Sequence, residues 1–414
     1  MRSLSYLLLL WASSICAAPF IYHSGSDLQK TINDAQAFST IVCERNERIT
    51  VSNTFVINKP LTLSGLNAQL VKGLGKTSIL RVECDHVSIT DFELHGNADS
   101  VDQSERAPLL LIEASDFRVE RGRFFNSSKD GIEVNTKRGG GDTVGGVIRD
   151  IVSDGVVRDT VSISGSFYPD GLKVRNVLVE NIRAHNSARR GAVEVSDGVE
   201  NITVRTVFAE NCRYAVDIQD HGHKTQINKN IVVDDVYAVD CRHAIRTENN
   251  AFGHENLTIQ NVVAKRCERP VEIFNTDRVH LSNIRVLEHS GEHPATHIKN
   301  CSGISILNVD VNGESLKSAV LIQSSNRLRL NGLNVDESAN FSSGVTYQIT
   351  RNHAYSNLTI QNVSVPAHFK TGILLENTSQ SGTLENYIVS MNMASVNDQI
   401  KGKGALVAGN VQSE

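Results

Sequence analysis

Polar side chains recur at matched places in the chain, each between two apolar residues of a short segment. Alternate residues of a strand face the same way, so one row of these side chains reads Glu133, Ser162, Glu194, Asp217, Arg246, Glu272 and Lys299. Two residues further on, a second row reads Asn135, Ser164, Ser196, Gln219 and Glu248. Cations come just before the same segments, at Lys129, Arg158, Arg189, Arg190, Arg213, Arg242 and Arg269. Carboxylates and hydroxyls flanked by cations favour an anionic ligand.

Irregular segments follow these rows at residues 136–146, 164–171, 219–229 and 249–255, and we expect them to form one wall of a site. Their polar residues are Lys137, Arg138, Tyr168, Asp170, His221, His223, Lys224 and His254. Histidine and tyrosine are side chains suited to proton transfer. A second interpretation stays open, in which the arginines are solvated turn residues and the carboxylates pair with cations as a surface ladder of little energy.

A repeat of roughly 25 residues, the size of one structural repeat in a solenoid, positions these side chains. Nearly all of its copies have apolar residues at the first, third and sixth positions, and they begin at Leu61, Val87, Phe117, Gly146, Val177, Ile202, Ile231, Leu257, Val279, Ile304, Leu328 and Leu358. The fifth position is often a residue type that tolerates the left-handed backbone of a sharp bend, as at Asp91, Asp150, Asn181, Asp235, Asn261, Asn283, Asn308, Gly332 and Asn362. A second apolar pair such as Val193 and Val195 follows each copy.

This pattern predicts an all-β fold, a right-handed parallel β-helix of about twelve coils over residues 45–390. A coil that cannot bury its own apolar face must stack on its neighbours, and no helix-length segment separates the strands. The leucine-rich-repeat signature is absent. Within a lead of residues 19–44, Ser26-Asp-Leu-Gln29 is a capping box, which predicts a helix over residues 26–38 that covers the first coil. Residues 391–414 lose the repeat and are expected to form a tail.

Residues 1–18 have the pattern of a secretory signal, with Arg2, an apolar stretch and a small-residue run at 16–18. Lipidation of Cys16 fits less well, because Ile15 precedes it. No later stretch approaches 18 apolar residues, so we expect no membrane span. We therefore expect an exported monomer, periplasmic or secreted. The formal net charge of −5 does not favour an overall basic nucleic-acid binder.

Six cysteines remain after removal of the signal, and none forms a Cys-x-x-Cys pair of the kind that binds structural zinc. Cys212, Cys241 and Cys267 occupy the same place in successive repeats. This placement favours a ladder of buried free thiols over disulfides. No carboxylate cluster has the spacing of a calcium loop, so we expect no metal or other cofactor.

The signal, the capping helix and the coils resemble the pectate-lyase-type β-helix superfamily over nearly the whole mature chain. That superfamily contains polysaccharide lyases, hydrolases and uronate epimerases, and fold alone does not select among them. For a calcium-dependent lyase, the resemblance implies Glu194 and Asp217 as ligands. For a hydrolase, it implies Glu194, Asp217 and Asp220, with His221-Gly-His223 similar to a Gly-His-Gly segment. For an epimerase, the string from Tyr214 to Asp220 resembles an Asp-Pro-His-Asp box in which Gln219 stands at the histidine.

The resemblance implies foremost a metal-independent lyase that cleaves a uronic-acid polysaccharide such as alginate or glucuronan by β-elimination. Removal of the C5 proton requires a cation on the adjacent carboxylate, a base and an acid. We expect Arg246 to be the cation, assisted by Arg190 or Lys137, with His221 or His243 as the base and Tyr168 as the acid. The expected substrate-binding residues are Lys137, Arg138, Arg190, Glu194, Tyr214, Asp217 and His243. A hydrolase, an epimerase and a non-catalytic polysaccharide-binding solenoid remain alternatives.

Overall fold

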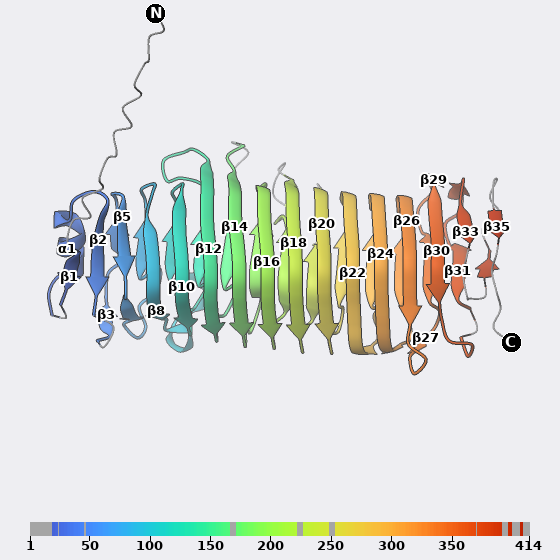
Figure 1. Ribbon diagram of the computed structural model, residues 1–414, viewed down its shortest axis with the longest axis horizontal. Helices are drawn as coiled ribbons and strands as arrows, with labels where there is room; N and C mark the ends of the chain where they lie inside the picture. Colours follow the sequence, from blue (N-terminus) through green and yellow to red (C-terminus); the bar gives the residue numbers. More distant parts are fainter. Residues whose placement is uncertain are drawn as a thin grey trace, which may run out of the picture.

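The computed structural model describes residues 19–23, 25–44, 47–165, 171–221, 227–247, 253–369, 371–390, 396–399 and 406–408. Over these residues the chain is a parallel β-helix of about 13 turns, which confirms the predicted fold class. Figure 1 shows the turns stacked along one nearly straight axis, from the first strands in blue to the last in red. Each strand therefore pairs with strands from the turns before and after it.

Two long sheets run the length of the helix in the described part of the chain. Sheet A consists of β1 (Phe20–Tyr22), β2 (Ser39–Cys43), β3 (Ile49–Val51), β5 (Leu61–Ser64), β6 (Asn67–Leu70), β8 (Ser88–His95), β10 (Phe117–Phe125), β12 (Thr143–Asp154), β14 (Val174–His185), β16 (Glu200–Glu210), β18 (Asn228–Val239), β20 (His254–Lys265), β22 (Thr276–Gly291), β24 (Ser302–Ser315), β26 (Asn326–Val335), β27 (Asn340–Phe341), β30 (Leu358–Ser364), β33 (Ile388–Ser390) and β35 (Leu406–Ala408).

Sheet B is built from shorter strands, which are β4 (Phe55–Ile57), β7 (Leu80–Val82), β9 (Leu110–Ile112), β11 (Ile132–Val134), β13 (Val161–Ser164), β15 (Gly191–Ser196), β17 (Tyr214–Gln219), β19 (His243–Thr247), β21 (Val271–Phe274), β23 (Thr296–Lys299), β25 (Val320–Gln323), β28 (Val345–Ile349), β31 (Ile373–Asn377) and β34 (Val396–Asp398). A small third sheet pairs β29 (Ala354–Ser356) with β32 (Thr383–Glu385). Two 3-10 helices, η1 (Ala98–Ser100) and η2 (Gln103–Glu105), lie in an excursion between β8 and β9.

The repeat explains both the core and the bends of sheet A. In β16, Ile202, Val204 and Val207 are buried at the predicted first, third and sixth positions. All nine residues predicted for the bend have a positive φ, for example 57° at Asp91 and 54° at Asn283. Their amides also link the turns, because Asn283 Nδ2 donates to Asn261 Oδ1 at 2.9 Å. The same residue type therefore bends the strand and connects neighbouring turns.

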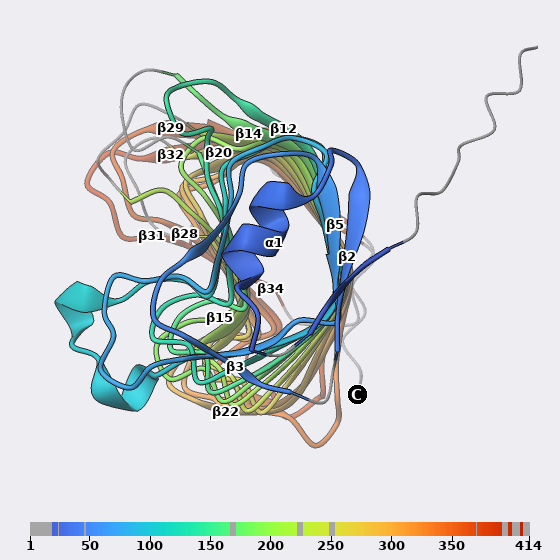
Figure 2. The same cartoon turned by 90° about the vertical axis from the view of Figure 1, so that its left-hand side faces the viewer.

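A short helix, α1 (Leu28–Asp34), covers the first turn, as Figure 2 shows. Leu28 and Ile32 are its buried residues, which is the predicted apolar face. The helix is shorter than the predicted range of 26–38, and its N-cap is Asp27, whose carboxylate accepts a hydrogen bond from Lys30 N at 3.1 Å. The predicted cap, Ser26, instead donates to the carbonyl of His23. The chain favours Asp27 because its side chain reaches the exposed amide groups of the first helical turn.

The C-terminal strands extend into the segment that was expected to be a tail. Strand β34 pairs with β31, and β35 pairs with β33, so both sheets continue beyond residue 390. The six cysteines are free and five of them are buried, which agrees with the predicted thiol ladder. Among the described residues, no helix is long and apolar enough to cross a membrane. The expected signal at residues 1–18 lies outside the described residues.

Candidate functional site

The strands of sheet B place the predicted polar rows in register. The first row aligns over successive turns at Glu133, Ser162, Glu194, Asp217, Arg246 and Glu272. The prediction for Lys299 is wrong, because Lys299 aligns with Phe274 while His297 aligns with Glu272. The reason is that Ile298 is the inward partner of Ile273, so the residue before it shares the row. In the second row Ser164, Ser196 and Gln219 align, and Glu248 lies outside the described residues.

The middle of the first row is buried although it faces away from the apolar core. Glu194 and Asp217 are both 0% exposed, so the interpretation of these carboxylates as a surface ladder is wrong. Removing a carboxylate from water is costly unless it is paired and hydrogen-bonded. Each buried carboxyl group should therefore have a charged or proton-sharing partner.

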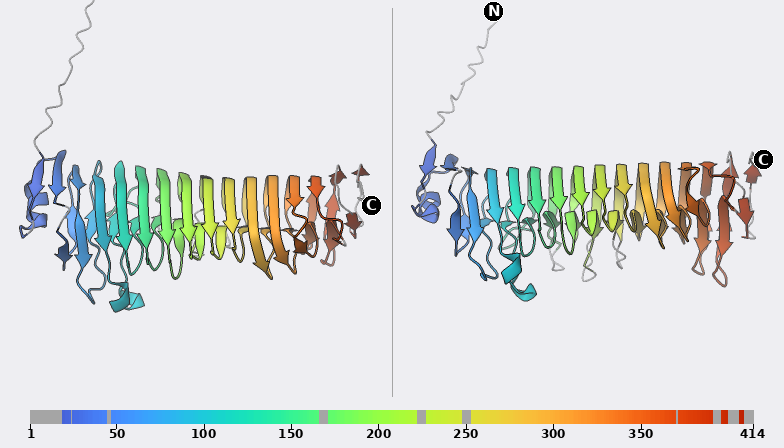
Figure 3. Two further views of the ribbon diagram at one scale, coloured as in Figure 1. Left: turned by 60° about the horizontal axis from the view of Figure 1, so that its bottom comes forward. Right: turned by 90° about the horizontal axis from the view of Figure 1, so that it is seen from below.

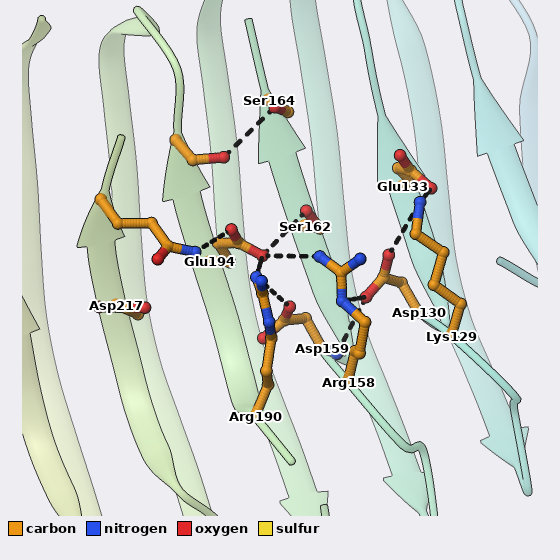
Figure 4. A network of polar contacts seen from close by, with 12 residues as sticks. Lys129, Asp130, Glu133, Arg158, Asp159, Ser162, Ser164, Arg190, Glu194 and Asp217 are labelled. Atoms are coloured by element: carbon orange, nitrogen blue, oxygen red, sulfur yellow. Dashed lines mark hydrogen bonds and ion pairs between the residues drawn. The ribbon is translucent and has the colours of Figure 1, made fainter. Parts of the chain in front are cut away.

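The carboxyl groups of Asp159 and Glu194 lie close together at the centre of a cluster of charged side chains (Figure 4). Burial and the charge of Glu194 raise the pKa of Asp159 well above its ordinary value. Burial would raise the pKa of Glu194 as well, but a hydrogen bond from Asp159 and the guanidinium groups of Arg190 and Arg158 lower it. Of the two carboxyl groups, Asp159 therefore binds a proton more tightly than Glu194 does. Tyr214 Oη also donates to Asp159 Oδ1, at 2.7 Å.

Two arginines contact this pair. Arg190 forms an ion pair with Glu194 and lies 3.5 Å from Asp159 Oδ2. The Arg158 side chain bridges Glu194 and Asp130, with 3.5 Å between the paired atoms on each side. Burial raises the pKa of Asp130 to about 6.

Lys129 completes the group by pairing with Glu133 and with Asp130. The cluster thus holds three cations, Lys129, Arg158 and Arg190, and four carboxyl groups, Asp130, Glu133, Asp159 and Glu194. One protonated carboxyl group among the four makes the charges equal. A proton on Asp159 would therefore complete the charge balance of the site.

His221 supplies an oriented imidazole at the edge of the cluster, with its side chain 25% exposed. Its Nδ1 lies 2.7 Å from Oδ2 of the buried Asp197, and its backbone amide donates to Asp197 Oδ1 at 3.1 Å. Its Nε2 therefore lies on the side of Gln219, Arg190 and Glu194, at 3.4, 3.5 and 3.5 Å. Burial alone would lower the pKa of His221, but the hydrogen bond and charge of Asp197 raise it. A histidine held in this way suits a general acid or base.

Asp217 and Arg246 form a two-point pair, with Arg246 Nε donating to Asp217 Oδ1 at 2.8 Å and a second bond from Nη2 to Oδ2. The Arg246 guanidinium carbon lies 5.3 Å from the centre of the Tyr214 ring. Tyr214 is fully buried. The predicted neutralising cation thus already has a carboxylate partner, and Tyr214 supports the carboxyl pair.

The alternative base, His243, lies one turn further along. Its Nε2 is 2.9 Å from Glu272 Oε2, and only 2% of its side chain is exposed. Glu272 also lies 3.6 Å from Arg269 Nη1. His243 is therefore enclosed in a separate ion-pair group, in contrast to the partly exposed His221.

Two predicted cations lie apart from this centre. Lys137 Nζ is 2.7 Å from Asp85 Oδ2, and Arg138 Nη1 is 2.5 Å from Glu83 Oε1, so both are paired toward the N-terminal turns. The predicted acid Tyr168 lies outside the described residues. Of the predicted site, the structure brings together Arg190, Glu194, Tyr214, Asp217, His221 and Arg246.

Three central residues escaped the sequence analysis, namely Asp130, Asp159 and Asp197. Asp130 and Asp159 hold the same place in two adjoining turns, each directly after a cation, in the pairs Lys129-Asp130 and Arg158-Asp159. That repeated pair was a usable signal. Asp197 follows the second row directly, and its sequence context gives no sign that it would face His221.

The arrangement joins an oriented imidazole, a close pair of carboxyl groups and several guanidinium groups within adjoining turns. Such groups can transfer protons and stabilise a developing negative charge. Within the described residues, no group of three or more His, Cys, Asp or Glu side chains is placed to hold a metal ion.

No protein-family model and no curated protein matches the chain. Among solved structures, the A-module of the Azotobacter vinelandii mannuronan C-5 epimerase AlgE6 is similar at 13% identity and a TM-score of 0.50, over 91% of this chain and 92% of that chain. An N-terminal fragment of bacteriophage phi29 gene product 12 is similar at 12% identity and a TM-score of 0.51, over 84% and 76%. The catalytic domain of a GH87 alpha-1,3-glucanase with one Asp-to-Ala substitution, in complex with nigerose, is similar at 8% identity and a TM-score of 0.50, over 95% and 68%. At these identities the likeness shows a shared fold.

Proposed function

We propose that the chain is an exported enzyme that acts on an acidic polysaccharide by removing the proton next to a sugar carboxylate. The observation that carries the proposal is the Asp197–His221 pair beside Arg190, with 2.7 Å between His221 Nδ1 and Asp197 Oδ2. A base oriented by a carboxylate next to a guanidinium is what this chemistry requires. The fold shared with an epimerase and a glucanase supports a polysaccharide as the substrate.

In the proposed lyase reaction, His221 takes the C5 proton and Asp197 stabilises the resulting imidazolium. The electron pair of the C5–H bond forms the C4=C5 double bond, and the C4–O4 bond breaks. The leaving O4 takes a proton from an acid, for which Tyr168 remains the candidate. Arg190 stabilises the charge that develops on the sugar carboxylate.

Epimerisation is the second candidate, because it shares the first step and the fold likeness includes a mannuronan C-5 epimerase. It differs in returning a proton to the opposite face of C5. Hydrolysis through Glu194 and Asp217 is less well supported. A glycosidase needs a carboxylic acid with a raised pKa that reaches the substrate. The pKa of Glu194 is lowered and Asp217 is held by Arg246, while Asp130 and Asp159, whose pKa values are raised, are both 0% exposed.

The test is to incubate the protein with a panel of polyuronates in D2O. A lyase produces the ultraviolet absorbance of an unsaturated uronate, and an epimerase places deuterium at C5 without that absorbance. We expect His221→Gln to lower turnover by about 10²–10⁴-fold. The control is His185→Gln, since His185 lies on sheet A and pairs with Glu210, and it should leave turnover unchanged.

The pH profile provides a second readout. The base must be neutral, so turnover should rise with pH through a pKa above the ordinary histidine value of about 6.5, in the direction that the contact with Asp197 gives. If His221→Gln retains the turnover of wild type, the assignment of His221 as the base is wrong. A panel that shows neither absorbance nor exchange would contradict the proposed function.

A further inference from the structure

A row of cations borders the site on the side where the chain enters sheet B. Lys129, Arg158, Arg190 and Arg213 hold equivalent places before β11, β13, β15 and β17. The first three pair with buried or half-buried carboxylates. Arg189, next to Arg190, is exposed, and no carboxylate of the described chain lies within ion-pair distance of it.

Arg106 reaches the same border from a different segment. It ends the excursion of residues 96–108 that carries η1 and η2, which Figure 3 shows in cyan, projecting from the side of the helix. The buried Asn97 holds this excursion in place, because its amide donates at 2.9 and 2.8 Å to the carbonyls of Val71 and Leu74. Arg106 Nε is buried and has no hydrogen-bond partner, and none of the described carboxylates pairs with this residue.

Arg106, Arg158 and Arg189 lie along one border, because Ser128 Oγ donates to the carbonyl of Ala107 and Arg189 N donates to the carbonyl of Val157. Arg106 precedes β9 and Arg189 precedes β15, so they are three turns apart, or roughly 14 Å at about 4.8 Å per turn, with Arg158 between them. Burial lowers the pKa of Arg106, and the positive charges of Arg189 and Arg158 lower it further. Arg158 has Asp130 and Glu194 as counter-charges, but the other two have none in the described chain. Positive charges held together without counter-charges destabilise the folded state. We therefore expect the counter-charge for Arg106 to come from a ligand.

We propose that Arg106 and Arg189 form a binding site for an anionic group, a carboxylate or a sulfate, of the polysaccharide chain. The site rests on the proposed function and narrows its substrate. Arg106 precedes β9 and His221 follows β17, so the two lie four turns apart, or roughly 19 Å at about 4.8 Å per turn. One sugar unit cannot span that length. The substrate is then a polymer with charged groups on several units, rather than a neutral chain with a single uronate.

The test uses inorganic sulfate as the probe and compares wild type with Arg106→Gln, Arg189→Gln and the double variant. Wild-type Tm should rise when sulfate is added at low ionic strength. The double variant should have a higher Tm than wild type without sulfate, because repulsion is removed, and sulfate should no longer raise it. On a polyuronate substrate, KM of the double variant should rise by about tenfold with kcat unchanged, the loss of one charge-assisted hydrogen bond.

Arg183→Gln is the matched control, since Arg183 is exposed on sheet A and none of the described carboxylates pairs with it. It removes the same charge and should leave the response to sulfate intact. The inference is overturned if the double variant responds to sulfate as wild type does, if Arg183→Gln weakens the response equally, or if the double variant is less stable without sulfate. The Tm measurements involve no turnover, so they fail or succeed independently of the proposed chemistry.

Discussion

The outer faces of sheets A and B differ in what they do with charge, although the same turns build both. On sheet A, Glu180 and Arg205 stack in adjoining turns at 2.6 Å and remain 26% and 47% exposed. On sheet B, Glu194 pairs with Arg190 of its own turn and is completely buried. Water screens the exposed pair of Glu180 and Arg205, whereas the buried Glu194 is stabilised only by its partners in the protein.

This difference supports our proposal that the functional site lies on sheet B. Sheet A also buries one carboxylate, Glu120, which pairs with three arginines. Sheet B buries Glu194 and Asp217 in adjoining turns, although desolvation offsets most of the attraction between buried charges. Local rules of stability are broken chiefly where function requires it. We propose that the buried pair of Asp159 and Glu194 is such a place.

The largest expected effect comes from breaking one ion pair on each of the two sheets. Glu194→Gln removes the charge that faces Arg190 and Arg158, and we expect it to lower the free energy of unfolding by about 3–5 kcal/mol. Glu180→Gln removes the exposed partner of Arg205 and should cost about 0–1 kcal/mol. Urea denaturation of both variants measures the difference. Equal losses on the two faces would show that burial of Glu194 does not set the energy of its pair.

The fold could be predicted because its signal is periodic and its causes are local. Asn283 at a bend and Ile284 in the core follow from their own types and spacing. The position of Lys299 was predicted wrongly because Thr296, which is not apolar, stands at the first inward position of its strand. A row follows the inward residues of its neighbours, and Ile298 sets that register.

The site was harder to predict because its decisive property is burial on an outward face. Spacing placed Glu194 and Asp217 in one row, but alternation alone assigns such residues to solvent. Contacts such as Asp197 with His221 join residues 24 positions apart, across neighbouring turns. Arg106 lies in an excursion outside the repeat, so no periodic pattern could include it.

A second prediction compares the pH dependence of the two faces. The raised pKa of Asp130, about 6, means that the folded chain binds this proton more tightly than the unfolded chain. Its contribution to stability is present below about pH 4 and is lost as pH rises to about 6. In urea denaturation, the free energy of unfolding of Asp130→Asn should rise by about 2–3 kcal/mol relative to that of wild type between pH 4 and pH 7.

Asp240, which follows β18 of sheet A, is the control with the opposite sign. The hydrogen bond from Arg266 lowers its pKa, so its contribution is present at neutral pH and is lost as pH falls. Asp240→Asn should therefore lose stability relative to wild type as pH rises from 3 to 7. The same sign of change in both variants would contradict the assigned pKa directions.

The smallest effect on stability is expected for Asp159→Asn, because its amide group can donate a hydrogen bond as a protonated carboxyl group does. In Asp159→Asn, the amide oxygen can accept the bonds from Tyr214 Oη and Gly191 N, and the amide nitrogen can donate to Glu194 as the protonated carboxyl does. We expect its free energy of unfolding at pH 7 to lie within about 1 kcal/mol of wild type, whereas Asp159→Ala should lose about 1–3 kcal/mol because its partners are left unsatisfied. Asp150→Asn on sheet A, where Asn181 Nδ2 donates to the carboxylate at 2.7 Å, should change stability by about 0.5 kcal/mol or less. A loss in Asp159→Asn as large as that in Glu194→Gln would mean that Asp159 is ionised, and the charge balance of three cations with three carboxylates on sheet B would then be wrong.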